Sequence, residues 1–181
     1  AGVFVGTDDT GYGRLLAETG VAIESYSATG AVSSIGPARL SFLFDWHGPS
    51  EPVETACSSS LVAIQRAVDA LRRGDAELAL AGGVNTIVTP WAHISFSKAG
   101  MLAGDGRCKA FSHDADGYVR AEGVGMLVLK TLSAAERSRD HIHAVIRGGA
   151  VNHGGRSGSL TAPNPRAQAD VVKAALLDAG V

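Results

Sequence analysis

The chain has 181 residues, of which 45% are apolar, 19% charged and 6% aromatic, and its formal net charge is −2 at pH 7. This length fits one domain or a large part of one, and the composition is that of a globular protein rather than a disordered one. The near balance of 16 basic and 18 acidic side chains leaves no excess for binding nucleic acid or an anionic membrane surface. No apolar run is long enough to span a bilayer, and residues 1–6 lack the layout of a secretion signal, so a cytoplasmic location is expected.

The first half of the chain predicts a strand–helix pattern. Residues 2–6 indicate a buried strand closed by glycine, and residues 33–44 indicate a helix entered near Pro37. Residues 52–56 form a short predicted strand that leads into an amphipathic helix, which Gly74 ends. The predicted apolar face of that helix consists of Leu61, Ile64, Ala67, Val68 and Leu71.

The second half continues as an α/β pattern. Residues 78–84 predict a buried strand that completes a βαβ unit, a glycine-punctuated segment follows, and residues 125–129 and 144–151 predict two more strands. The last predicted helix has Asn164 as its N-cap and reaches Gly180. Because the chain begins inside a predicted strand and stops without a tail after the last predicted helix, residues 1–181 are expected to be a central part of a larger domain.

The two cysteines, Cys57 and Cys108, cannot form a disulfide framework, and no neighbouring ligands give either of them zinc-site spacing. Cys57 lies where a predicted strand turns into a helix, and unpaired N–H groups at a helix N-terminus favour a thiolate or an oxyanion. A helix N-terminus stabilises a nearby negative charge by about 0.3–1 kcal/mol. Lowering the pKa of a thiol from about 8.5 to about 6.5 requires about 2.7 kcal/mol. A nucleophile at Cys57 therefore needs a basic partner, usually histidine.

Structural roles compete with this interpretation of each cysteine. A free cysteine is most often a small buried apolar side chain, but the junction position and the three serines after Cys57 favour the nucleophile there. Cys108 lies between Arg107 and Lys109, which would favour its thiolate, yet it has neither a helix start nor a placed base. A structural role is therefore expected for Cys108.

A set of motifs in order along the chain resembles the β-ketoacyl synthases of the thiolase superfamily, specifically the ketosynthase domains of modular polyketide synthases. The nucleophile motif is Thr55-Ala56-Cys57-Ser58-Ser59-Ser60. Residues 48–52 resemble the same segment in ketosynthases from assembly lines with free-standing acyltransferases. The other matching blocks are at residues 39–41, 48–50, 81–85, 98–102, 105–111, 115–125 and 160–164.

The resemblance implies a thiolase-like layered α/β/α/β/α fold, of which residues 1–181 would hold the end of the N-terminal half and the start of the C-terminal half. It implies that Cys57 accepts an acyl chain from an acyl carrier protein and that a malonyl-type extender is condensed with it by decarboxylation. The Cys57 N–H would be one oxyanion donor, and Tyr118 would help to shape the acyl pocket. No cofactor or metal is expected, the substrates being carried on phosphopantetheine. A homodimer paired through residues 52–56 is also expected.

The resemblance leaves the basic partner of Cys57 unassigned, because the assisting histidines of the family come after the point where this chain ends. The six histidines present are expected in structural or solvated positions. These include His153, the histidine whose motif most resembles a catalytic one. The carboxylates of residues 105–122 have neither calcium-loop nor zinc spacing, and the glycines of residues 117–125 do not form a dinucleotide-binding loop. The 12 arginines are expected to form a solvated face rather than a docking surface for a carrier protein.

Two other functions compete with the condensing enzyme. A non-elongating domain of the same fold would accept and pass on acyl chains through Cys57 while lacking one downstream histidine. A cysteine hydrolase would need ordered partners and the Gly-x-Ser-x-Gly arrangement, which this sequence lacks. Three positions also depart from the pattern of the family without touching the nucleophile, and they are Ala38, Glu54 and Gln65.

Overall fold

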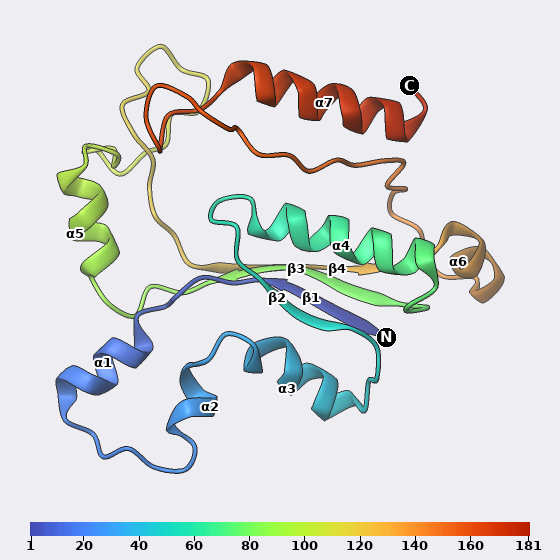
Figure 1. The fold of residues 1–181 in the computed structure, drawn as a ribbon, viewed down its shortest axis with the longest axis horizontal. Coiled ribbons are helices and arrows are strands. Elements are labelled where there is room, and N and C mark those ends of the chain that lie inside the picture. Colours follow the sequence, from blue (N-terminus) through green and yellow to red (C-terminus); the bar gives the residue numbers. More distant parts are fainter.

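Each strand is followed by one or more helices in the computed structural model, which describes residues 1–181 (Figure 1). In chain order the elements are β1 (Gly2–Gly6), α1 (Tyr12–Thr19), α2 (Ser27–Ala31), α3 (Ile35–Phe44), β2 (Ser50–Val53), α4 (Ser59–Arg73), β3 (Ala79–Asn85), α5 (Trp91–Lys98), β4 (Gly123–Leu129), α6 (Leu132–Ser138) and α7 (Pro165–Ala179).

The strands form one mixed sheet in the order β2-β1-β3-β4. Strand β1 is parallel to both of its neighbours, with Val3 opposite Ser50 in β2 and opposite Leu80 in β3, and β4 is antiparallel to β3. The predicted βαβ unit is confirmed, but β1 lies between its two strands. The carboxyl ends of β1, β2 and β3 therefore meet at one edge of the sheet, where parallel sheets carry their sites.

Helix α4 covers one face of the sheet and supplies much of the core, while α3 lies on the opposite face (Figure 1). The helix has the predicted extent, with Gly74 as its left-handed C-cap, but its buried face differs from the predicted one because Leu61 is exposed. Small side chains line the buried face, which allows α4 to approach the sheet closely. The core cluster consists of Phe4, Val53, Ala63, Ala67, Ala70, Leu71, Ala79 and Ala81.

Residues 144–151 do not form the predicted strand. A strand needs a neighbouring backbone to complete its ladder, whereas this segment runs between the two helices α4 and α7 (Figure 1). The Gly149 N–H donates to the Asp178 carboxylate at 3.0 Å, and Arg72 donates to the Arg147 carbonyl at 3.3 Å. The strand predicted at residues 144–151 is therefore wrong, because helix side chains take the place of a neighbouring strand.

Sequence reasoning predicted the ends of α7 and missed four short helices. The Asn164 side chain accepts hydrogen bonds from the N–H groups of Arg166 and Ala167, and Gly180 is the left-handed C-cap, as predicted. Helices α1, α2, α5 and α6 have at most eight residues each, too short for a clear period of 3.6. No helix in the structure combines the length and the apolar character that crossing a bilayer requires.

Candidate active site

The turn that carries Cys57 joins β2 to α4. The strand was expected to reach Ala56, but it ends at Val53, and α4 begins at Ser59. Between them the chain turns sharply, with Ala56 in the left-handed region at a φ of 55°. A non-glycine residue rarely adopts this conformation, so the surrounding contacts must hold it. The result is a tight elbow that leaves the Cys57 side chain exposed.

Hydroxyl groups from the first residues of α4 hold this elbow. The Ser59 hydroxyl accepts a hydrogen bond from the Thr55 N–H at 2.9 Å and donates one to the Ala56 carbonyl at 2.7 Å. The Ser58 hydroxyl donates to the Thr55 carbonyl at 2.8 Å and lies 2.9 Å from the Thr55 hydroxyl. The serines that follow Cys57 therefore hold the turn by replacing ladder hydrogen bonds with side-chain ones.

The backbone N–H groups of Cys57 and Ser58 donate no hydrogen bond within the protein. Both lie at the N-terminus of α4, where unpaired donors and the helix dipole favour negative charge. An oxyanion that forms on a carbonyl attached to the Cys57 sulfur would meet this environment. The family resemblance implies an oxyanion donor at Cys57, and the Cys57 N–H has no acceptor within the protein.

Two glycines of the sheet allow the first turn of α4 to lie against it. A Cβ atom at Gly6 would come within 2.7 Å of the Ser60 nitrogen, and one at Gly83 would come within 2.9 Å of the Ser60 Cβ. Neither distance is possible between real atoms without a shift, so only glycine fits at these positions. The two glycines thus determine how closely the first turn of α4, and with it the turn that carries Cys57, packs against the sheet.

No histidine is hydrogen-bonded to Cys57. His153 accepts the Gly155 N–H on its Nδ1 at 2.9 Å, within its own turn, while His47 and His113 pair with the adjacent carboxylates of Asp45 and Asp114. The rings of His141 and His143 stack edge to face on each other. The 181 residues therefore place a candidate nucleophile without placing its base.

Cys108 lies in a loop that ion pairs hold in shape. Its sulfur accepts a hydrogen bond from the Val119 N–H at 3.3 Å. The neighbouring Lys109 ammonium lies 2.6 Å from Asp116 and 2.9 Å from Asp105. Asp116 and then Asp105 raise the pKa of Lys109, and Lys109 lowers the pKa of Asp105. These carboxylates act as loop partners, and no group of His, Cys, Asp and Glu has the arrangement of a metal site.

Tyr118 pairs with the segment that follows α5. Its N–H donates to the Met101 carbonyl, its carbonyl accepts the Ala103 N–H, and its ring meets Phe96 edge to face at 6.2 Å. The ring is partly exposed. No hydrogen bond joins Tyr118 to the elbow of Cys57, so its place in an acyl pocket rests on the family resemblance.

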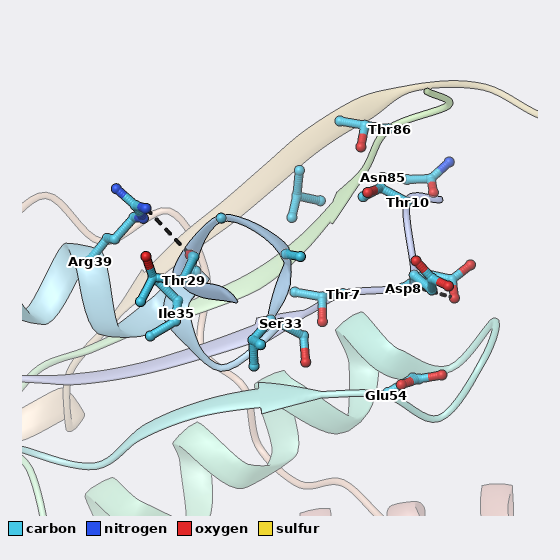
Figure 2. A pocket seen from close by; sticks show the side chains of 16 residues that line it. Thr7, Asp8, Thr10, Thr29, Ser33, Ile35, Arg39, Glu54, Asn85 and Thr86 are labelled. Atoms are coloured by element: carbon cyan, nitrogen blue, oxygen red, sulfur yellow. Dashed lines mark hydrogen bonds between the residues drawn. The ribbon is translucent and has the colours of Figure 1, made fainter. Parts of the chain in front are cut away.

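A cavity of about 330 Å³ lies at the carboxyl ends of the three parallel strands, and sequence reasoning did not identify it. Figure 2 shows Thr7, Asp8 and Glu54 lining it beyond β1 and β2, and Asn85 lining it as the last residue of β3. Arg39 reaches it from α3 and donates to the Thr29 carbonyl at 3.4 Å. The rule that parallel sheets bind ligands beyond their carboxyl ends is the one signal that could have located it.

Comparison with known proteins identifies the family. The family model described as the β-ketoacyl synthase N-terminal domain matches residues 1–135, and the one described as the C-terminal domain matches residues 143–181. The chain belongs to the β-ketoacyl synthase family. It is 55% identical over 180 residues to the polyketide synthase PksN of Bacillus subtilis and 47% identical over 180 residues to the erythronolide synthase EryA2 of Saccharopolyspora erythraea. These matches cover 99% of this chain, but 3% of PksN and 5% of EryA2.

Solved ketosynthase domains share the fold. The oxazolomycin ketosynthase domain OzmH KS7 of Streptomyces albus superposes with a TM-score of 0.88 at 43% identity. The ketosynthase from module 6 of the bacillaene synthase of Bacillus subtilis gives 0.89 at 38% identity. Each match covers 99% of this chain, and 31% and 30% of those chains respectively. The predicted fold class is confirmed: this chain has part of the thiolase-like ketosynthase fold, and ketosynthase domains of polyketide synthases are enzymes.

Proposed function

We propose that this chain supplies the nucleophile of a ketosynthase that extends polyketide chains, and that Cys57 is this nucleophile. The Cys57 sulfur attacks the thioester carbonyl of an acyl group carried on the phosphopantetheine of an acyl carrier protein. The resulting oxyanion is bound by the Cys57 N–H. Its collapse breaks the bond to the carrier sulfur, which leaves as a thiolate and takes up the proton that the Cys57 thiol gave up, and the acyl group stays on Cys57.

The second step forms the new carbon–carbon bond. A malonyl-type extender on a carrier protein loses carbon dioxide, and the electron pair of the broken bond attacks the Cys57 thioester. The bond to the Cys57 sulfur then breaks and returns the thiolate, while the lengthened β-ketoacyl chain stays on the carrier. Neither reaction step uses a cofactor or a metal, because the carrier protein brings both acyl groups already activated as thioesters.

The elbow is the observation that carries this proposal. An exposed sulfur beside an unpaired N–H at a helix N-terminus suits attack on a thioester. Tyr118 is proposed to contact the acyl chain, on the resemblance alone. The carrier protein is proposed as the partner because both acyl groups must arrive as thioesters.

A homodimer paired through β2 is also proposed. Strand β2 is at the edge of the sheet, so one side of its backbone is open to a second copy. Helix α3, which packs against β2, also exposes the apolar side chains of Phe42, Leu43 and Phe44. Light scattering of the full polypeptide is expected to give a dimer, and a monomer at micromolar concentration would contradict it.

Acyl transfer on the full polypeptide tests the main proposal. The protein is incubated with an acyl-loaded carrier protein and digested, and the peptide containing Cys57 is expected to gain the mass of the acyl group. Cys57→Ala should abolish the transfer, whereas the matched variant Cys108→Ala should retain it. Acyl groups found on Cys108, or released as free acid by the wild type, would contradict the proposal. Adding malonyl carrier then separates the two ketosynthase roles: a lengthened chain indicates condensation, and an acyl group that is only passed on indicates the non-elongating type.

A further inference from the structure

The Ser59 side chain is the one buried polar side chain of the elbow, at 8% exposure. Its hydroxyl uses both of its hydrogen-bonding roles on the residues before Cys57, accepting from the Thr55 N–H and donating to the Ala56 carbonyl. The Ser59 N–H also donates to the Ala56 carbonyl, at 3.1 Å. Two donors from a single residue therefore hold one carbonyl oxygen.

The Ala56 carbonyl and the Cys57 N–H belong to the same peptide unit. A peptide unit is planar, so fixing the direction of its C=O also fixes the direction of its N–H. In this elbow the C=O is held by Ser59, while the N–H has no partner in the protein. The residue that precedes the unit, Ala56, is in the left-handed region, so the plane would turn readily if its carbonyl were released.

We infer that Ser59 is a positioning residue for the reaction at Cys57. By holding the Ala56 carbonyl it aims the Cys57 N–H at the oxyanion formed during acyl transfer. The Ser59 hydroxyl makes its hydrogen bonds to Thr55 and Ala56 and none to the Cys57 sulfur. This inference rests on the proposed function of Cys57 as the acyl-accepting nucleophile.

Two reactions of the same sulfur separate this role from a general contribution to folding. Acylation by a thioester passes through an oxyanion and depends on the aim of the N–H, whereas alkylation by iodoacetamide displaces iodide and forms no oxyanion. Loss of an oxyanion donor reduces acyl transfer by about 10²- to 10³-fold. Because the Ser59 N–H still holds the carbonyl in Ser59→Ala, a smaller loss of about tenfold in acylation is expected, with little change in alkylation.

The test compares the full polypeptide as wild type, Ser59→Ala and Ser60→Ala. The hydroxyl of Ser60 makes no hydrogen bond, so Ser60→Ala is the matched control from the same helical turn. Acylation of Cys57 by the butanoyl thioester of N-acetylcysteamine and alkylation by iodoacetamide are both followed by mass spectrometry of the Cys57 peptide. The ratio of the two rates is expected to fall about tenfold in Ser59→Ala and to stay at the wild-type value in Ser60→Ala.

The outcomes distinguish the two proposals. A ratio that is unchanged in Ser59→Ala, including one where both rates fall together, would overturn the positioning role while leaving the nucleophile intact. An equal fall of the ratio in Ser60→Ala would overturn it as well. A wild-type protein that takes no butanoyl group on Cys57 would overturn the proposed function and, with it, this inference.

Discussion

The guanidinium of Arg72 donates a hydrogen bond to the carboxylate of Asp178 at 3.1 Å, joining the last turn of α4 to the last turn of α7. The same carboxylate accepts the Gly149 N–H, so it also ties the extended segment that runs between the two helices. One side chain thus connects three parts of the chain that are far apart in sequence. Breaking its contacts is expected to loosen α7 without affecting the sheet.

The attachment of α7 is expected to weaken in acid. The Gly149 N–H and then Arg72 lower the pKa of Asp178 below its usual 3.8. Because this pKa is lowered on folding, the ionised Asp178 carboxylate stabilises the attachment of α7 in full at pH values above 3.8. This stabilisation is lost as the pH falls through the lower pKa of Asp178 in the folded protein. The amide chemical shift of Gly149, followed by NMR from pH 6 downward, should therefore titrate with a midpoint below 3.8. Asp178→Asn should remove the titration, and Asp170→Asn, on the same helix but without an ion pair, should leave it.

Cys57 is expected to react with iodoacetamide well before Cys108. Both cysteines are exposed, but the Cys57 sulfur makes no hydrogen bond within the protein, whereas the sulfur of Cys108 accepts a hydrogen bond from the Val119 N–H, which lowers its nucleophilicity. Peptide mass spectrometry over a time course of the full polypeptide measures both rates. Equal rates, or faster labelling of Cys108, would rule out the assignment of the nucleophile.

Gly6→Ala is expected to displace the Cys57 elbow, because the new methyl group would lie between β1 and the first turn of α4. The new Cβ would lie 2.7–2.9 Å from backbone atoms of Ser59 and Ser60, so the first turn of α4 must move. Overpacking of this kind costs about 1–3 kcal/mol, which urea denaturation would measure, and acyl loading of Cys57 should fall too. Gly104→Ala is the control, because no heavy atom lies within 4 Å of its Cβ position. Equal stability of the two variants would contradict the close approach described here.

The 181-residue chain expressed by itself is expected to self-associate. Only 18 of its residues are buried, while large apolar side chains such as Ile23, Phe42 and Leu160 are almost fully exposed. Apolar surface of this extent favours contacts between molecules. Sedimentation should therefore show species larger than a monomer, and a dye for apolar surface should bind. A monomer with a cooperative melting transition would refute this expectation.

Local sequence determined the elements whose signals lie within a few residues. Asn164 and Gly180 fixed both ends of α7, and the glycine at 74 fixed the end of α4, because caps satisfy backbone groups within one turn. The Cys57 motif also located the elbow and the nucleophile candidate. These features depend on neighbours in the chain, which a sequence displays directly.

Tertiary structure alone determined which distant residues meet. The placing of β1 between β2 and β3, the absence of a ladder for residues 144–151, and the contact of Gly6 with the start of α4 all depend on partners far along the chain. In the sequence, Ser59 is one of three consecutive serines with no signal that distinguishes it. In the folded turn, its hydroxyl donates a hydrogen bond to the Ala56 carbonyl. Local periodicity and capping carry no record of such pairings, because they arise only when the sheet and its covering helix pack together.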